Sequence, residues 1–404
     1  MRGNAKTEKA EETIMDFKKE IAALTDDMIA LRRDFHRHPE LGLHEVRTSQ
    51  IVADYLQNLG LEVRRCAGTG VIGVLKGAHP GKTVLMRCDM DALPVTEDTG
   101  LPFSSENPGV MHACGHDGHT AIHLTTVRLI AQHREQLHGT VVFLFQLNEE
   151  DAGAELMIED GALENPKPDA VCGFHLWSPI PTGTIAMIPG PIMASSWYFK
   201  IVIHGRGGHG GSPHKAINPI DAAAHVLESF KTFHTLEQDA TKPTVIAVCK
   251  IHAGQKDIIV PDNLEMEGSI RCLHNEDAQV RARIKELCEA VCKAYRCTCD
   301  IDFKCGNTLL DNNPHMTELA MQCAERVVGK ENIITKDIAM MVGDDFAEFS
   351  RRVPGVYYFV GTGSEEAHST FEHHSPHFTI DERSLPIAVQ MEAEMIATYL
   401  HFDE

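Results

Sequence analysis

The chain has 404 residues, of which 43% are hydrophobic and 24% charged, and its formal net charge at pH 7 is −21. This length suits two to three globular domains, and no apolar run is long enough for a transmembrane helix. The acidic balance argues against a nucleic-acid partner, because binding to phosphates needs a basic surface. The first twenty residues are charged and lack the apolar core of a secretory signal, so we expect a cytoplasmic protein without a membrane partner.

Helical and extended patterns alternate along the first half of the chain. Helices are expected at about 12–34, 43–59 and 120–137. Nearly unbroken apolar runs predict strands at 70–77, 82–94, 139–150 and 169–177. Such strands, alternating with helices, indicate an α/β fold with a mainly parallel sheet that is covered on both faces.

The pattern changes near residue 190, where strands begin to alternate apolar and polar residues. Four such strands and two helices predict a smaller α+β unit with a half-exposed sheet. The first pattern returns at about 305, with a helix near 314–328, an apolar strand and a terminal helix from about 381. We therefore expect one catalytic domain formed by residues 1–190 and 305–404, interrupted by an inserted domain at 191–304.

Polar side chains follow the predicted buried strands at the points where these strands end. They are Asp89, Asp91, Glu149, Glu150 and His175. In parallel sheets ligands bind beyond the carboxyl ends of the strands. The sequence therefore predicts a functional site at this edge.

The segment MHACGHDGH, residues 111–119, holds one thiol and three imidazoles. Cysteine thiolate and neutral imidazole are natural ligands of zinc and similar ions, so Cys114 and His116 are candidate metal ligands. Two residues supply only part of a coordination shell, and the other candidates are Glu149, Glu150, His175 and the pair His373/His374. The alternative is a nucleophilic Cys114 activated by a histidine, which would leave the carboxylates at the same edge without a role.

The segment NEED supplies the adjacent carboxylates Glu149 and Glu150. Neighbouring residues of an extended chain point in opposite directions, so both cannot face one metal ion equally. We expect one glutamate to bind metal and the other to take the proton of a metal-activated water. A solvated acidic loop is the alternative.

Two further features fall in the predicted inserted domain. The segment HGRGGHGG contains Gly-x-Gly-x-x-Gly, but no helix begins on its last glycine, so a dinucleotide site is rejected. These glycines instead present His209, whereas His204 and His214 are interpreted as surface residues. Arg271 ends a strand and could grip a carboxylate in two places, or it could be a surface ion-pair partner.

Seven segments resemble, in order, motifs of the aminoacylase and hippurate-hydrolase branch of the co-catalytic zinc metallopeptidases. That branch includes plant hydrolases that free indole-acetate from amino acids. The resemblance covers residues 28–395, and its segments are FHRHPELGLHE, RCDMDALPV, HACGHDGHTA, NEEDAGA, HLWSPIPTG, GRGGHGGSPH and HHSPHFTIDE.

The resemblance implies a zinc-aminopeptidase-like catalytic domain and an inserted lid that dimerises, giving a homodimer or homotetramer. It implies two divalent ions per subunit, of zinc, manganese, cobalt or nickel. Their ligands would be Cys114, His116, Glu150, His175 and His374. Glu149 matches the general base, with Asp89 and Asp91 as supporting acids. His209 would stabilise the oxyanion in the partner subunit's site, and Arg271 would hold the substrate carboxylate.

The implied reaction is hydrolysis of the amide bond of a small N-acyl or N-aroyl amino acid. The chain departs from the family pattern at Ile258, where asparagine is usual, and at Trp197, Gly210 and Asp344. These departures concern substrate choice more than the metal ligands. A dipeptidase or aminopeptidase on the same scaffold, or a metal-stabilised relative without catalysis, are the alternative functions.

Overall fold

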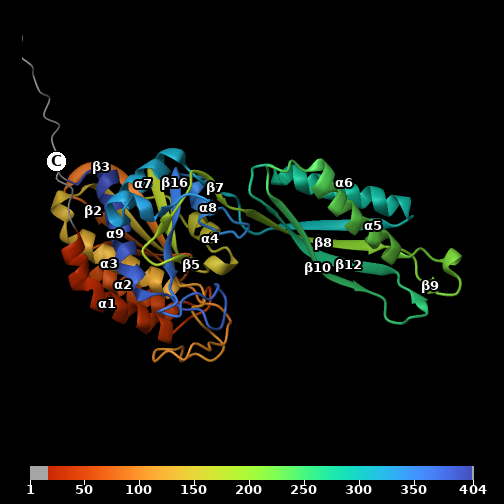
Figure 1. Ribbon diagram of the computed structural model, residues 1–404, viewed down its shortest axis with the longest axis horizontal. Coiled ribbons are helices and arrows are strands. Elements are labelled where there is room, and N and C mark those ends of the chain that lie inside the picture. Colours follow the sequence, from red (N-terminus) through yellow and green to blue (C-terminus); the bar gives the residue numbers. More distant parts are fainter. Residues whose placement is uncertain (1–16, 403–404) are drawn as a thin grey trace, which may run out of the picture.

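The computed structural model describes residues 17–402, which form two lobes joined by a narrow neck (Figure 1). The larger lobe is built on an eight-stranded sheet and the smaller on a four-stranded sheet. The chain enters the smaller sheet at Ser195 and leaves it at Cys305. The segment in which the sequence pattern changes thus forms the separate four-stranded sheet of the smaller lobe.

The eight-stranded sheet has the strand order β1-β2-β4-β3-β5-β16-β6-β15. Its central strands β4, β3, β5 and β16 run parallel, whereas β1 and β2 at one edge, and β6 beside β16, pair antiparallel. The expectation of a mainly parallel sheet is therefore confirmed at its centre. The bounds are β1 Glu62–Cys66, β2 Gly70–Lys76, β3 His79–Asp89, β4 His138–Gln146, β5 Ala170–Pro181, β6 Ile185–Ala186, β15 Ile333–Ile334 and β16 Gly355–Gly363.

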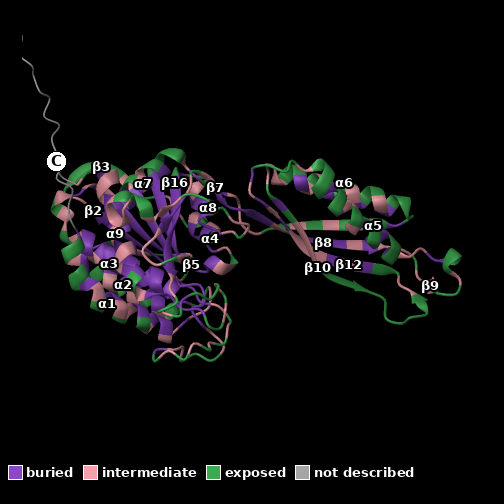
Figure 2. Cartoon of the chain, in the orientation of Figure 1, coloured by how far each residue is buried: buried purple, intermediate pink, exposed green. Residues whose placement is uncertain are grey.

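Helices cover both faces of this sheet (Figure 2). The side chains on both sides of its central strands are therefore buried. One face packs against α1 Lys18–Arg37, α2 Val46–Asn58, α3 His116–Gln132, α7 Pro314–Val328 and α9 Leu385–Leu400. The other packs against α4 Ala154–Glu159 and α8 Ala347–Ser350. The helix expected at 120–137 begins earlier, at His116, because Gly115 adopts φ +94° and turns the chain into the helix. The part of the first expected helix before residue 17 lies outside the described residues.

The smaller lobe has one covered and one open sheet face. Its strands follow the order β10-β12-β8-β13 and all pair antiparallel. Two helices pack on one face, and the other is exposed, as the alternating sequence predicts (Figure 2). The bounds are β8 Ser195–His204, β10 Thr244–Ala253, β12 Asn263–Cys272, β13 Thr298–Cys305, α5 Pro219–Thr232 and α6 Asp277–Ala294.

Short strand pairs mark the two ends of this lobe. β7 Gly190–Met193 pairs with β14 Leu310–Asn312 at the neck, and β9 Gly208–His209 pairs with β11 Ile259–Val260 at the far tip (Figure 1). Among the described residues, no helix is both long and apolar enough to cross a membrane.

Candidate metal centre

The candidate site lies at the carboxyl ends of the central parallel strands. β3 ends at Asp89, and the chain crosses the same edge again after β4, where a single 3-10 turn carries Glu149 and Glu150. His175 lies on β5, and His116 is the first residue of α3. The parallel arrangement of the strands thus brings residues distant in sequence to one edge, as expected.

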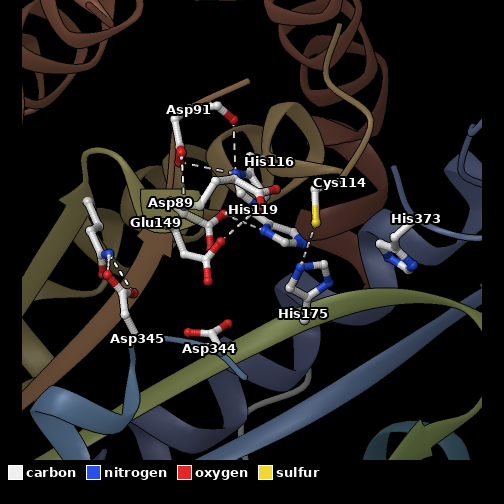
Figure 3. Close-up of polar contacts among 12 residues, drawn as sticks. Asp89, Asp91, Cys114, His116, His119, Glu149, His175, Asp344, Asp345 and His373 are labelled. Carbon is white, nitrogen blue, oxygen red and sulfur yellow. Dashed lines mark hydrogen bonds and ion pairs between the residues drawn. The ribbon is translucent and has the colours of Figure 1, made fainter. Parts of the chain in front are cut away.

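Five groups of donor atoms from the described residues lie at this edge, each with all its atoms within 4.8 Å of one another. Three contain only the expected ligands and Glu149: Cys114/His116/His175, Cys114/Glu150/His374 and His116/Glu149/Glu150. The other two are Asp89/His116/His119 and Glu149/Asp344/Asp345. The Cys114 thiol is 3.4 Å from His175 Nε2, and Glu150 Oε1 is 3.3 Å from His374 Nε2. All five expected ligands and Glu149 are therefore brought together, and Figure 3 shows most of them around one centre.

Two buried polar atoms of this group fit a bound cation. His116 Nε2 and Glu150 Oε1 make no hydrogen bond within the described chain, and Glu150 Oε1 makes an ion-pair contact with His374 Nε2. His116 Nδ1 lies 2.9 Å from the carbonyl oxygen of Asp91, so Nδ1 carries a proton and Nε2 is the nitrogen that would bind a metal ion in place of a second proton. His175 has the same arrangement, because its Nδ1 is 2.7 Å from the Leu176 carbonyl. In both rings Nδ1 is therefore held by a backbone carbonyl oxygen, and the ring orientation directs Nε2 toward the other donor atoms.

The electrostatics of the site also favour a cation. Burial raises the pKa of Glu149 well above its usual range, and the nearby Asp344 and Glu150 raise it further. Burial likewise raises the pKa of the Cys114 thiol, with Glu150 and Glu149 adding to the effect. Burial opposes ionisation of His116, yet Asp89 and Asp91 raise its pKa to about 10. This excess of buried carboxylates is typical of a site built to hold positive charge.

The two aspartates expected to give support contact the ligands directly or through one neighbour. Asp91 reaches His116 Nδ1 and accepts a hydrogen bond of 3.1 Å from the backbone N–H of Glu150. Asp89 is fully buried and accepts a hydrogen bond of 2.6 Å from His119 Nδ1. Asp91 therefore contacts a candidate ligand directly, and Asp89 contacts His119, which lies on the same helix as His116.

His209 and Arg271 are not brought to this centre. His209 is exposed on β9, at the tip of the smaller lobe farthest from the eight-stranded sheet (Figure 1). Arg271 lies near the neck, where its Nη1 donates to the carbonyl oxygen of Met341 at 3.0 Å. Within one chain, the structure therefore separates the candidate oxyanion donor from the candidate base.

One local expectation was wrong, and several buried residues of the site were not foreseen. Glu149 and Glu150 were expected in extended chain, but β4 ends at Gln146 and the glutamates occupy a 3-10 turn between Asn148 and Ala152, which both have positive φ. Such a turn lets neighbouring side chains approach one centre. The residues not foreseen are Arg87, His119 and Asp345. The nearness of His119 to the CGHDGH ligands in sequence was the only signal for it.

The fold and site together define a metal-dependent hydrolase, with thiolate, imidazole and carboxylate donors and an additional glutamate beside them. Residues 85–398 match the model of Peptidase family M20/M25/M40. The chain belongs to this family.

The chain is similar over most of its length to several known proteins. It is 37% identical to thermostable carboxypeptidase 1 of Saccharolobus solfataricus, over 92% of this chain and 94% of that protein. It is 41% identical to an N-acyl-L-amino acid amidohydrolase of Geobacillus stearothermophilus, over 68% of this chain and 75% of that protein. A solved Bacillus subtilis structure described as a dinuclear metal binding peptidase of the M20 family superposes with a TM-score of 0.83 at 33% identity, covering 95% of this chain and all of that one.

Proposed function

We propose that this protein hydrolyses the amide bond of N-acyl or N-aroyl amino acids, releasing a carboxylic acid and an amino acid. Two divalent ions would be held by Cys114, His116, Glu150, His175 and His374. The observation that carries the proposal is the position of Glu149, which lies within 4.8 Å of His116 and Glu150 but is absent from the two groups that contain Cys114. A carboxylate beside a metal shell is suited to proton transfer.

When bound, divalent ions polarise an acyl carbonyl and make water a better acid near neutral pH. Glu149 takes the proton of the attacking water and then passes it to the leaving amine nitrogen. Asp91 holds His116 and the Glu150 backbone, so the donor atoms keep their orientation during the reaction.

The smaller lobe, residues 191–304, would act as a lid and as the interface of a homodimer or homotetramer. Its edge strand β10 leaves one side of its backbone without a partner strand, and this strand exposes Val245 and Ile251. A second copy can supply His209, which lies too far along this lobe to serve its own chain without a large movement. Arg271 at the neck would grip the carboxylate of the substrate.

Substrate choice would follow the exposed residues around His209. The apolar side chain of Ile258 is 51% exposed. Its backbone lies beside His209, because the N–H of Gly210 donates a hydrogen bond of 2.8 Å to the Ile258 carbonyl oxygen. An apolar group at this position favours substrates with an apolar acyl or aroyl part over polar ones. Zinc, manganese, cobalt and nickel all suit the mixed donor set, and a cytoplasmic location stays a prediction.

Elemental analysis combined with a substrate panel tests the proposal. We expect about two metal ions per chain, and turnover of hippurate or N-acetyl-methionine that depends on them. Glu149→Gln should lower kcat by at least about a thousandfold while metal content stays unchanged. Turnover confined to dipeptides with a free amine would favour a dipeptidase, and unchanged turnover in Glu149→Gln would exclude this mechanism.

The role of a second copy has its own test. His209→Ala and Glu149→Gln subunits are each expected to be inactive as homodimers. Mixed dimers contain one site in which both residues are intact, so statistical reassembly should restore about a quarter of the activity. No recovery after exchange of subunits would show that His209 does not act across the interface.

A further inference from the structure

A series of buried, hydrogen-bonded polar side chains connects the segment that carries the Glu149–Glu150 turn to the neighbouring strands and to α3. The carboxylate of Asp345 accepts hydrogen bonds from Gln146 Nε2 at 2.7 and 2.8 Å and from the backbone N–H of Ala154 at 2.8 Å. Gln146 is the last residue of β4 and Ala154 the first of α4. Asp345 therefore ties together both ends of the segment that carries the candidate base and one candidate ligand.

Arg87 extends this connection across the sheet. Its Nη2 donates to Asp345 at 2.9 Å, its Nε to Gln146 at 2.7 Å and its Nη1 to Asp89 at 2.6 Å. All four side chains have 0% exposure. A guanidinium offers donors in a rigid planar fork, so the three acceptors are held at fixed angles to one another.

His119 completes the connection on the other side. Its Nδ1 is 2.6 Å from Asp89 Oδ1, and its Nε2 is 2.9 Å from the backbone nitrogen of Leu176, the residue after His175. A backbone N–H can only donate, so Nε2 accepts and Nδ1 carries the proton given to Asp89. The roles of both ring nitrogens of His119 are thereby fixed.

We propose that this buried chain, Asp345–Arg87–Asp89–His119 (the brace), sets the spacing between the Glu149–Glu150 turn and the His175 strand end. The inference rests on the proposed function. It assigns Asp345 and His119 as positioning residues, because both oxygens of Asp345 and both ring nitrogens of His119 are already engaged in hydrogen bonds within the chain. The brace joins β4, β3, α3 and β5, and Figure 3 shows three of its members, Asp89, His119 and Asp345. Loss of one bond would let the two halves of the donor set separate, which weakens metal binding and misplaces Glu149.

Single substitutions can cut the two ends of the brace, and the one at Asp345 is nearly isosteric. Asp345→Asn removes one carboxylate oxygen and turns an amide toward groups that already donate. His119→Asn can still donate to Asp89, but it is too short to accept from the Leu176 N–H. His123→Asn is the matched control, because His123 lies one turn further along α3, is equally buried, and also links a carboxylate, Glu392, to a backbone group.

The experiment uses zinc-loaded protein and follows metal release to a chelator, kcat and KM, and thermal unfolding. For Asp345→Asn and His119→Asn we expect release about 10- to 100-fold faster than wild type. We also expect a similar fall in kcat, with KM changed less than about threefold. His123→Asn should lose comparable thermal stability yet keep wild-type metal release and kcat.

Equal effects of His119→Asn and His123→Asn on metal release would overturn the proposal, since buried histidines would then contribute only to stability. If His119→Asn does not fold, Asp345→Asn decides alone, and metal release at the wild-type rate from its folded protein would also overturn it. Metal release is measured without a substrate. A wild-type protein that fails to hydrolyse N-acyl amino acids would therefore contradict the proposed function and leave the brace testable.

Discussion

Glu97 gives a prediction whose magnitude can be worked out. Its side chain is 4% exposed, lies 3.3 Å from His36 Nε2, and accepts a hydrogen bond of 2.6 Å from the backbone N–H of Ser105. Burial opposes ionisation, but the hydrogen bonds from His36, Ser105 and Thr99 lower the pKa of Glu97 from 4.5 to about 2. His36 also donates a hydrogen bond of 2.8 Å to Asp117, which accepts another of 2.8 Å from Arg32. Asp117 directly follows His116, so this cluster borders the candidate metal site.

The sign of the effect follows from linkage. Because the pKa of Glu97 is lower in the folded state, its ionised form stabilises the fold above pH 4.5, and this stabilisation is lost as the pH falls toward 2. The difference in pKa corresponds to about 3 kcal/mol in full, of which about 1.4 kcal/mol disappears between about pH 6 and pH 3.5. Glu97→Gln cannot ionise, so it should show a smaller loss of stability over this interval by that amount.

Urea unfolding of metal-stripped wild type and variant at the two pH values measures this difference without a contribution from metal release. Glu106→Gln is the control, because Glu106 is on the same loop but its side chain is 63% exposed. It should behave as wild type. Equal pH dependence of wild type and Glu97→Gln would refute the argument and show that the cluster does not keep Glu97 ionised.

Further predictions concern the surroundings of the base and the metal. Tyr357→Phe removes the hydroxyl that donates to buried Asp344, so the free energy of unfolding should fall by about 1.5–3 kcal/mol in urea unfolding. Tyr358→Phe should be nearly neutral, because the Tyr358 hydroxyl is buried without a partner in the described structure. Removal of metal by a chelator should lower the melting temperature in calorimetry, since ligand at a thousand times its Kd contributes about 4 kcal/mol. An unchanged melting temperature would contradict a metal centre built from these residues.

The sequence predicted the layers of the fold because its strands carry clear patterns. Unbroken apolar runs gave the buried central strands, and alternating residues gave the half-exposed sheet of the smaller lobe. The local conformation after β4 was not predictable in this way. The positive φ of Asn148 and Ala152, which shapes the Glu149–Glu150 turn, leaves no mark in hydrophobic periodicity.

The brace shows a different limit of sequence reasoning. Arg87 and Asp345 are 258 residues apart, and their contact depends on the order of the strands rather than on any local motif. An arginine within an apolar run can equally be a boundary residue or a buried ion-pair partner. Only the folded structure shows that three acceptors surround it.

The histidines of α3 show why motif spacing alone does not identify a metal ligand. His116, His119 and His123 lie on one face of the helix, and each directs Nδ1 toward a carboxylate. Their Nε2 atoms differ: that of His119 accepts from the Leu176 backbone, and that of His123 lies 3.1 Å from the Met86 carbonyl. Among these three rings only His116 has an unpartnered Nε2. The same helical repeat thus presents three histidines, and only the partner of the second ring nitrogen separates the candidate ligand from the two rings that are already hydrogen-bonded on both sides.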